Sequence, residues 1–227
     1  MLQQGMSGQS ASKKEFDNFK AFRERLPRDV LLSIHADRIL ESFAIEEERG
    51  WKAKIGSLFD RAPLRAVSLV IPTDVSDEDA MHALNARFRE MFPDKKRAAI
   101  YEPHIEEILD AGNGGGRRSG GPRIIRLIGV VPDTTNITHD QQAEVLQQNG
   151  LTFPHPIEQA LAAAAYACKR SGEDLFKDLS VRGSVPGFAL STYQNFGVDV
   201  YRYVGAFDIG NVAASGSPSP ELKNLDR

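Results

Sequence analysis

The sequence predicts an α/β fold with a partly parallel central sheet flanked by helices, an N-terminal helical segment and a C-terminal β-hairpin. Three observations predict it. Apolar runs of strand length alternate with amphipathic stretches over residues 64–150, two of those stretches begin with capping-box patterns, and alternating apolar residues surround "QNFG" near the end. Since alternating strands and helices usually build parallel sheets, we expect one domain over residues 14–212.

The N-terminal part reads as a tail followed by helices. Residues 1–13 are mostly Gln, Ser and Gly, so we expect them to be disordered. Residues 14–62 form the predicted helical segment, in which aromatic and aliphatic residues recur at helical spacing up to Pro27 and again from Leu32 to Phe43. Packing into the core explains these stripes better than docking of a partner.

The middle part, residues 64–150, contains the alternating elements. Residues 64–72, 97–102 and 122–131 are the predicted strands. Ser76 with Asp79 and Thr138 with Gln141 match capping boxes, so helices are expected to begin at these two points, and a short helix is expected near residues 103–112.

The C-terminal part, residues 151–212, combines one helix with a hairpin. Pro156 suits the first position of a helix and Gly172 a position just beyond its end. Cys168 falls on the apolar face of that helix, which predicts a buried thiol rather than a nucleophile. Residues 188–193 and 198–204 alternate around a turn, and residues 213–227 are expected to be a flexible tail.

Composition excludes several function classes. The 28 Lys and Arg residues against 31 Asp and Glu residues give a net charge of -3, which provides no general attraction for nucleic acid or anionic lipid. One cysteine forms no internal disulfide, and no Cys/His pattern has zinc spacing. The sequence shows no membrane span or signal peptide. We therefore expect a cytoplasmic protein of bacterial or phage type, and no motif indicates a cofactor.

The glycine-rich segment "DAGNGGGRRSGGPRIIRLIGVV" over residues 110–131 could be a phosphate-binding loop or a connection between two elements. A phosphate-binding loop follows a strand and opens a helix, whereas these glycines follow a predicted helix and lead into a strand. A helix-to-strand connection is the better interpretation. Arg117, Arg118 and Arg123 leave anion or nucleic-acid contact as the alternative for this segment.

The carboxyl ends of the predicted strands suggest a second candidate site. Asp74, Glu102, His104 and Asp133 follow the three strands, beside Thr73, Thr135 and Asn136. If the strands were adjacent and parallel, these side chains would meet at one edge of the sheet, where they could hold a divalent metal or share acid and base roles. The same residue types also form turns and helix caps.

Two short pieces resemble ADP-ribosyltransferases. "GFALSTYQNF" is similar to the strand that carries the Ser-Thr-Ser motif of that family, and "RIIRLIG" to the arginine-bearing strand before it. Tyr193 departs from the third motif position, and Glu221 in the Ser/Pro-rich tail is the only later glutamate. The resemblance is confined to these pieces, so we assign no family.

The sequence thus favours a binding or accessory module that acts through contacts with another protein, without a membrane. The alternative is a small hydrolase or transferase at the Asp74/Glu102/His104/Asp133 edge, with or without a divalent metal.

Overall fold

The computed structural model describes residues 26–45, 65–95, 98–113, 122–177, 179–185, 187–193, 197–202 and 212–218. Several predictions concern parts of the chain outside these ranges: the tail at residues 1–13, the aromatic stripe that precedes Pro27, the segment around Trp51, Arg117, Arg118, and the tail beyond residue 218.

The described helices begin where the local sequence provides caps. α4 (Asp77–Met91) opens at Ser76, whose hydroxyl oxygen accepts from the Asp79 amide at 3.0 Å. α6 (His139–Gln148) opens with the Thr138–Gln141 capping box. Both predicted helix starts are confirmed. The remaining helical elements are α2 (Arg28–Glu41), η1 (Glu102–His104), α5 (Ile105–Asn113) and α7 (Pro156–Lys169).

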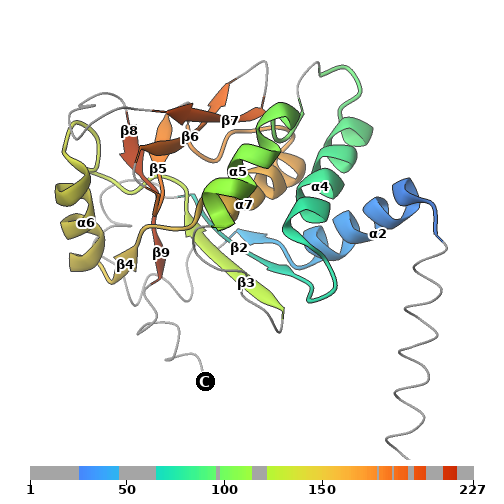
Figure 1. Cartoon of the computed structure of the whole chain (residues 1–227), viewed down its shortest axis with the longest axis horizontal. Helices are drawn as coiled ribbons and strands as arrows, with labels where there is room; N and C mark the ends of the chain where they lie inside the picture. The colour runs from blue at the N-terminus through green and yellow to red at the C-terminus, as the bar shows by residue number, and fades with distance from the viewer. Residues whose placement is uncertain are drawn as a thin grey trace, which may run out of the picture.

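The strands within the described ranges form three small sheets (Figure 1). The first has the order β1 (Ala44–Ile45), β2 (Ala66–Ile71), β3 (Arg123–Ile128). The second has the order β7 (Gly197–Arg202), β6 (Phe188–Tyr193), β5 (Ser180–Arg182), β8 (Val212–Ala214). β4 (Leu151–Thr152) pairs with β9 (Ser217–Pro218). The fold therefore mixes helices and strands, and the predicted hairpin is the antiparallel pair β6–β7.

The prediction of a partly parallel central sheet needs correction. β2 and β3 pair directly and antiparallel, with Ile71 opposite Arg123 and Ala66 opposite Ile128. The predicted strand at residues 97–102 does not lie between them: Ile100 instead makes an isolated parallel bridge to Val198 of β7. The chain crosses to the other sheet between α4 and α5, so β3 returns beside β2 from the opposite end. Within the four-stranded sheet, β5 and β8 are parallel.

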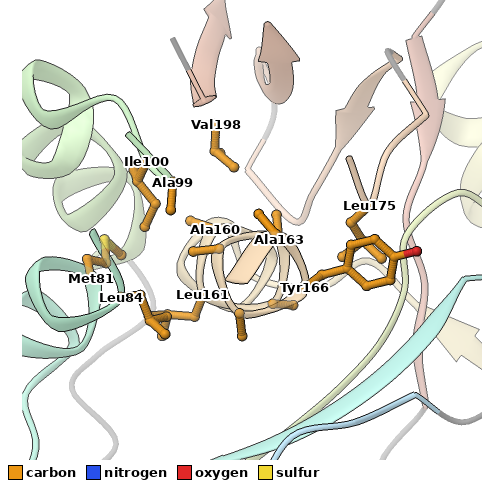
Figure 2. Close-up of a cluster of buried hydrophobic side chains, with 14 of the residues drawn as sticks. Met81, Leu84, Ala99, Ile100, Ala160, Leu161, Ala163, Tyr166, Leu175 and Val198 are labelled. Atoms are coloured by element: carbon orange, nitrogen blue, oxygen red, sulfur yellow. The ribbon is translucent and has the colours of Figure 1, made fainter. Parts of the chain in front are cut away.

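α7 occupies the centre of the domain. It contacts α2, α4 and α5 as well as strands of both larger sheets, and Figure 2 shows Leu84 of α4, Ile100, and Val198 of β7 around it. Its sequence explains the position, because alanines at 160 and 162–165 keep the helix thin while Ile157 and Leu161 fill space, and all of these residues are buried. Pro156 begins the helix, as its fixed φ predicts.

The ordered core extends beyond the predicted domain end at residue 212. Ala213, Ala214 and Ser215 have no exposed surface, and residues 213–218, which we expected in a flexible tail, take part in β8 and β9. Gly216 closes this region: a Cβ there would lie 2.9 Å from a Leu151 methyl and 3.0 Å from a Val131 methyl. The small residues at 213–216 let this end of the chain pack inside the fold.

Candidate functional site

The four predicted edge residues do not lie together. Asp74 follows β2 and accepts two hydrogen bonds from the Arg38 guanidinium of α2, at 2.8 and 2.9 Å. These bonds raise the pKa of Arg38 although partial burial opposes them. Since about a third of each side chain is exposed, the pair holds α2 to the end of β2 with a small contribution to stability.

Glu102 and His104 lie in η1 and have neighbours of their own. Glu102 pairs with Arg89 of α4 at 2.9 Å. The His104 Nε2 atom lies 3.9 Å from the Glu107 carboxylate, and the ring meets Tyr101 edge to face. Glu102 therefore contacts an arginine, and His104 contacts a glutamate of α5, rather than Asp74 or Asp133.

Asp133 lies at the other end of the first sheet. Because β2 and β3 are antiparallel, the end of β2 is next to the start of β3, while Asp133 follows the end of β3. It has a positive φ of 60°, which suits a turn position that Asp tolerates. Across the ranges that the structure describes, no three His, Cys, Asp or Glu residues are close enough to hold a metal ion.

Arg123 is engaged within the fold. Its guanidinium donates to both carboxylate oxygens of Asp77, one of them at 3.0 Å, and so ties the start of β3 to the first turn of α4. Its predicted partners in the anion site, Arg117 and Arg118, are outside the described residues.

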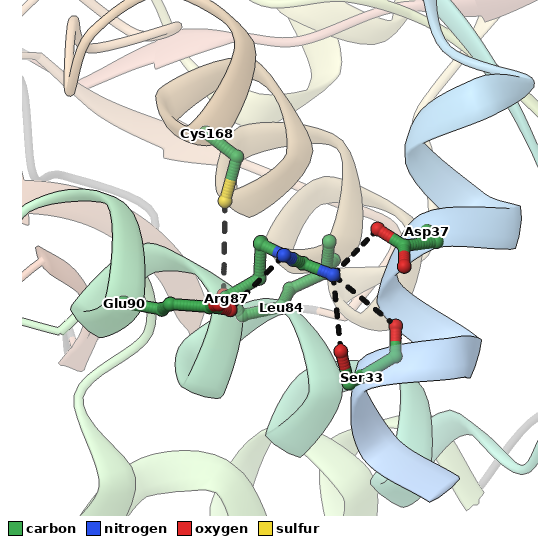
Figure 3. A network of polar contacts seen from close by, with 6 residues as sticks. All are labelled: Ser33, Asp37, Leu84, Arg87, Glu90 and Cys168. Carbon is green, nitrogen blue, oxygen red and sulfur yellow. Dashed lines mark hydrogen bonds and ion pairs between the residues drawn. The ribbon is translucent and has the colours of Figure 1, made fainter. Parts of the chain in front are cut away.

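A second arginine links two helices. Arg87 of α4 donates to the Ser33 hydroxyl at 3.1 Å and to Asp37 at 2.5 Å, both on α2, and pairs with Glu90 at 3.0 Å (Figure 3). Cys168 of α7 lies above this group, with its thiol 3.7 Å from the Leu84 carbonyl. Burial raises the pKa of this thiol to about 12, so it stays protonated. The prediction of a buried Cys168 is confirmed.

A buried polar group that the sequence analysis missed lies between α6, α7 and β5. Arg182 of β5 is 1% exposed and donates to the Gln142 side-chain oxygen at 3.2 Å. Gln159 of α7 donates to the Arg182 carbonyl at 3.1 Å and to the Ser215 hydroxyl. Two glutamines, one on α6 and one inside the largely apolar α7, were the available signal. This group joins three elements through their polar atoms.

The structure also contains an open groove between α5 and the β5–β6 turn. Its volume is about 540 Å³. It is lined by Pro103, Glu106, Glu107, Asp110, Ala111, Val185, Gly187 and Phe188. The lining thus combines three carboxylates, all from α5, with apolar surface from both sides. No basic residue is among these lining groups.

Comparison with known proteins gives no relative: neither a family model, nor a curated protein, nor a solved structure matches the chain. No helix among the described residues is long and apolar enough to cross a membrane. The function is therefore inferred from the residues and the structure of the chain itself.

Proposed function

We propose that the chain is a binding module for another protein, and that the groove between α5 and the β5–β6 turn receives a basic segment of that partner. The observation that carries the proposal is the composition of the groove. We place the interaction in a reducing compartment such as the cytoplasm, because the single cysteine is a buried thiol.

The acidic side of the groove supports a cationic partner. Glu106, Glu107 and Asp110 occupy neighbouring turns of one short helix, and Glu106 and Asp110 are exposed. His104 lies 3.9 Å from Glu107, on the flank of this acidic surface. Opposite charges across an interface speed association and reject partners of the wrong charge. A lysine or arginine is the side chain that these carboxylates would select.

The apolar side of the groove supports a protein segment rather than a free ion. Phe188 is 5% exposed, and Val185 and Ala111 are partly exposed beside it. Lys and Arg bury their methylene stems on apolar surface while the charged head reaches a carboxylate. A bulky aliphatic residue next to the basic one would fill the remaining space. The expected occupant is therefore an extended segment with basic and apolar residues in sequence.

The enzyme alternative has less support. It requires Asp74, Glu102, His104 and Asp133 to meet, and the structure holds them at separate places with Asp74 on Arg38 and Glu102 on Arg89.

A photo-crosslinking experiment tests the proposal. Ala111 is replaced by p-benzoylphenylalanine, and the cross-linked partner is recovered from the native cell and sequenced around the link. The charge-reversed variant Glu106→Lys/Asp110→Lys should lose most of the cross-link. The control Asp94→Lys/Glu144→Lys makes the same charge change at exposed sites outside the groove and should retain it. Equal yields from both variants, or an acidic partner segment at the link, would refute the proposed docking mode.

A further inference from the structure

The segment after β3 and α6, rather than a further strand of this sheet, cover the outer side of β8: the Val131 amide donates to the Ala214 carbonyl at 2.8 Å, and side chains bind the neighbouring main-chain groups. β8 is the last strand of the four-stranded sheet. The Gln142 amide nitrogen of α6 donates to the Val212 carbonyl at 3.0 Å and to the Thr134 carbonyl at 2.6 Å. The Ala214 amide in turn donates to the Thr134 hydroxyl at 2.9 Å. An exposed strand edge is a template for pairing with another chain, and α6 with its preceding turn occupies this one.

The cover is attached through the hydrogen bonds of buried Gln142 and through a small apolar contact that Leu146 and Val145 make. Of the α6 side chains, only Gln142 and Leu146 are buried. Leu146 joins a small apolar cluster, separate from the main core, that consists of Ala66, Ile128, Val131, Leu146, Leu151 and Ala214. Elements with few buried apolar contacts open locally at lower free energy than the domain unfolds. α6 is therefore suited to open while the core around α7 stays folded.

A histidine at the start of this helix lies in a site that favours its neutral form, with 31% of its side chain exposed. The His139 ring stacks on Phe153, with centroids 4.5 Å apart and planes 12° from parallel. Its Nε2 atom is buried and has no hydrogen-bond partner. The charged groups that act on it are Arg182 of β5, which is repulsive, and Asp140 of α6, 3.9 Å from Nδ1. Phe153, from the segment after β4, is uncharged.

A protonated His139 would carry a second N–H group without an acceptor, near the Arg182 guanidinium and at the positive end of a helix dipole. Burial first, and Arg182 second, lower the pKa of His139 from its usual 6.5, although Asp140 acts in the opposite direction. The neutral ring also leaves Nε2 without a partner, but it carries no charge for Arg182 to repel, and its flat contact with Phe153 is retained.

We propose that α6 is a pH-sensitive cover of the β8 edge, closed while His139 is neutral and released when its imidazole is protonated. Above pH 6.5 the ring is neutral whether α6 is closed or open. As the pH falls below 6.5, the open state takes up a proton more readily than the closed state, so acidification favours opening by up to about tenfold per pH unit. Opening is no longer favoured further once the pH falls below the pKa that His139 has in the closed state. Opening of α6 exposes the Val212 carbonyl, which Gln142 binds in the closed state.

Hydrogen exchange measured by mass spectrometry between pH 7.5 and 5.0, corrected for intrinsic rates, tests this. In the wild type, peptides covering α6 and β8 should lose protection below pH 6.5, while peptides of α4 and α7 keep theirs. His139→Phe keeps a flat ring on Phe153 without a titrating group, so it should remove the pH dependence. His82→Phe, at a partly exposed position on α4, is the matched control and should preserve it.

Two results would overturn the proposal. One is a His139→Phe variant that retains the wild-type pH dependence at α6. The other is a loss of protection that reaches α4 and α7 at the same pH as α6, because that is unfolding of the whole domain. An NMR titration of the His139 ring in the wild type needs no variant: its midpoint should lie below 6.5 and coincide with shifts of α6 amides, and a midpoint at or above 6.5 contradicts the mechanism.

Discussion

Asn85 offers the sharpest test of how the core is held together. This residue of α4 is fully buried, and its side chain binds the main chain of Ile100 twice: the amide nitrogen donates to the Ile100 carbonyl at 2.8 Å, and the side-chain oxygen accepts from the Ile100 N–H at 2.7 Å. Ile100 makes one isolated bridge to β7. The Asn85 side chain thus takes the main-chain hydrogen bonds of Ile100 that a neighbouring strand would otherwise make.

The cost of Asn85→Ala follows from these two bonds. Each buried backbone group left without a partner costs about 1–3 kcal/mol, so two cost about 2–6 kcal/mol. Alanine has a higher helix propensity by about 0.5 kcal/mol, which offsets little of this. We expect the free energy of unfolding to fall by at least about 1.5 kcal/mol. The Asn149→Ala control removes one bond, from Nδ2 to the Val145 carbonyl at 2.7 Å in a partly buried site, and should cost about 1 kcal/mol or less.

Urea denaturation followed by circular dichroism measures both variants, and amide exchange reports on Ile100 directly. Asn85→Asp adds a sign test. A carboxylate accepts from the Ile100 N–H but repels its carbonyl, so this variant should be least stable at neutral pH and recover as acid protonates the carboxyl group. If Asn85→Ala unfolds at the same urea concentration as Asn149→Ala, the reasoning on Ile100 is wrong.

Three further predictions concern single side chains. Cys168 should react with a thiol reagent at pH 8 only after unfolding, since burial raises its pKa to about 12; rapid labelling of the native protein would contradict this. Ser76→Ala should lower the free energy of unfolding by about 1 kcal/mol through loss of the α4 cap, and an unchanged urea midpoint would show that the cap is dispensable. Asp74→Asn should cost at most about 1 kcal/mol, because about a third of each side chain in its pair with Arg38 is exposed. Added magnesium should leave the melting temperature of wild type and variant unchanged, and a magnesium-dependent rise in the wild type would revive the edge site.

Local features of the fold could be predicted because single residues encode them. Ser76 and Thr138 satisfy amide groups within one helical turn, and Pro156 fixes a φ angle that begins a helix. Whether two strands run parallel or antiparallel depends on which strands become neighbours in the sheet, and no local sequence pattern predicts that. The run at residues 97–102 has strand composition, yet Asn85 binds the main chain of Ile100 on one side and Val198 bridges it on the other, while β2 and β3 pair antiparallel without it.

The groove and the buried polar group could not be predicted for a related reason. The groove joins α5 to Val185 and Phe188, which are distant in sequence, and each half alone resembles an ordinary surface. Gln142 and Gln159 appear as polar positions on amphipathic helices, and only the fold turns them toward Arg182 and β8. Such sites depend on tertiary placement rather than on composition.

The central position of α7 has a consequence for synthesis on the ribosome. α4 emerges about 80 residues before α7, and at about 5–20 residues per second this interval lasts roughly 4–16 seconds. Throughout that time Met81 and Leu84 of α4 lack the helix that buries them in the finished domain (Figure 2). The nascent chain therefore exposes its most apolar surface to chaperones until the alanine-rich helix arrives, and truncations before Pro156 should aggregate rather than fold as a smaller unit.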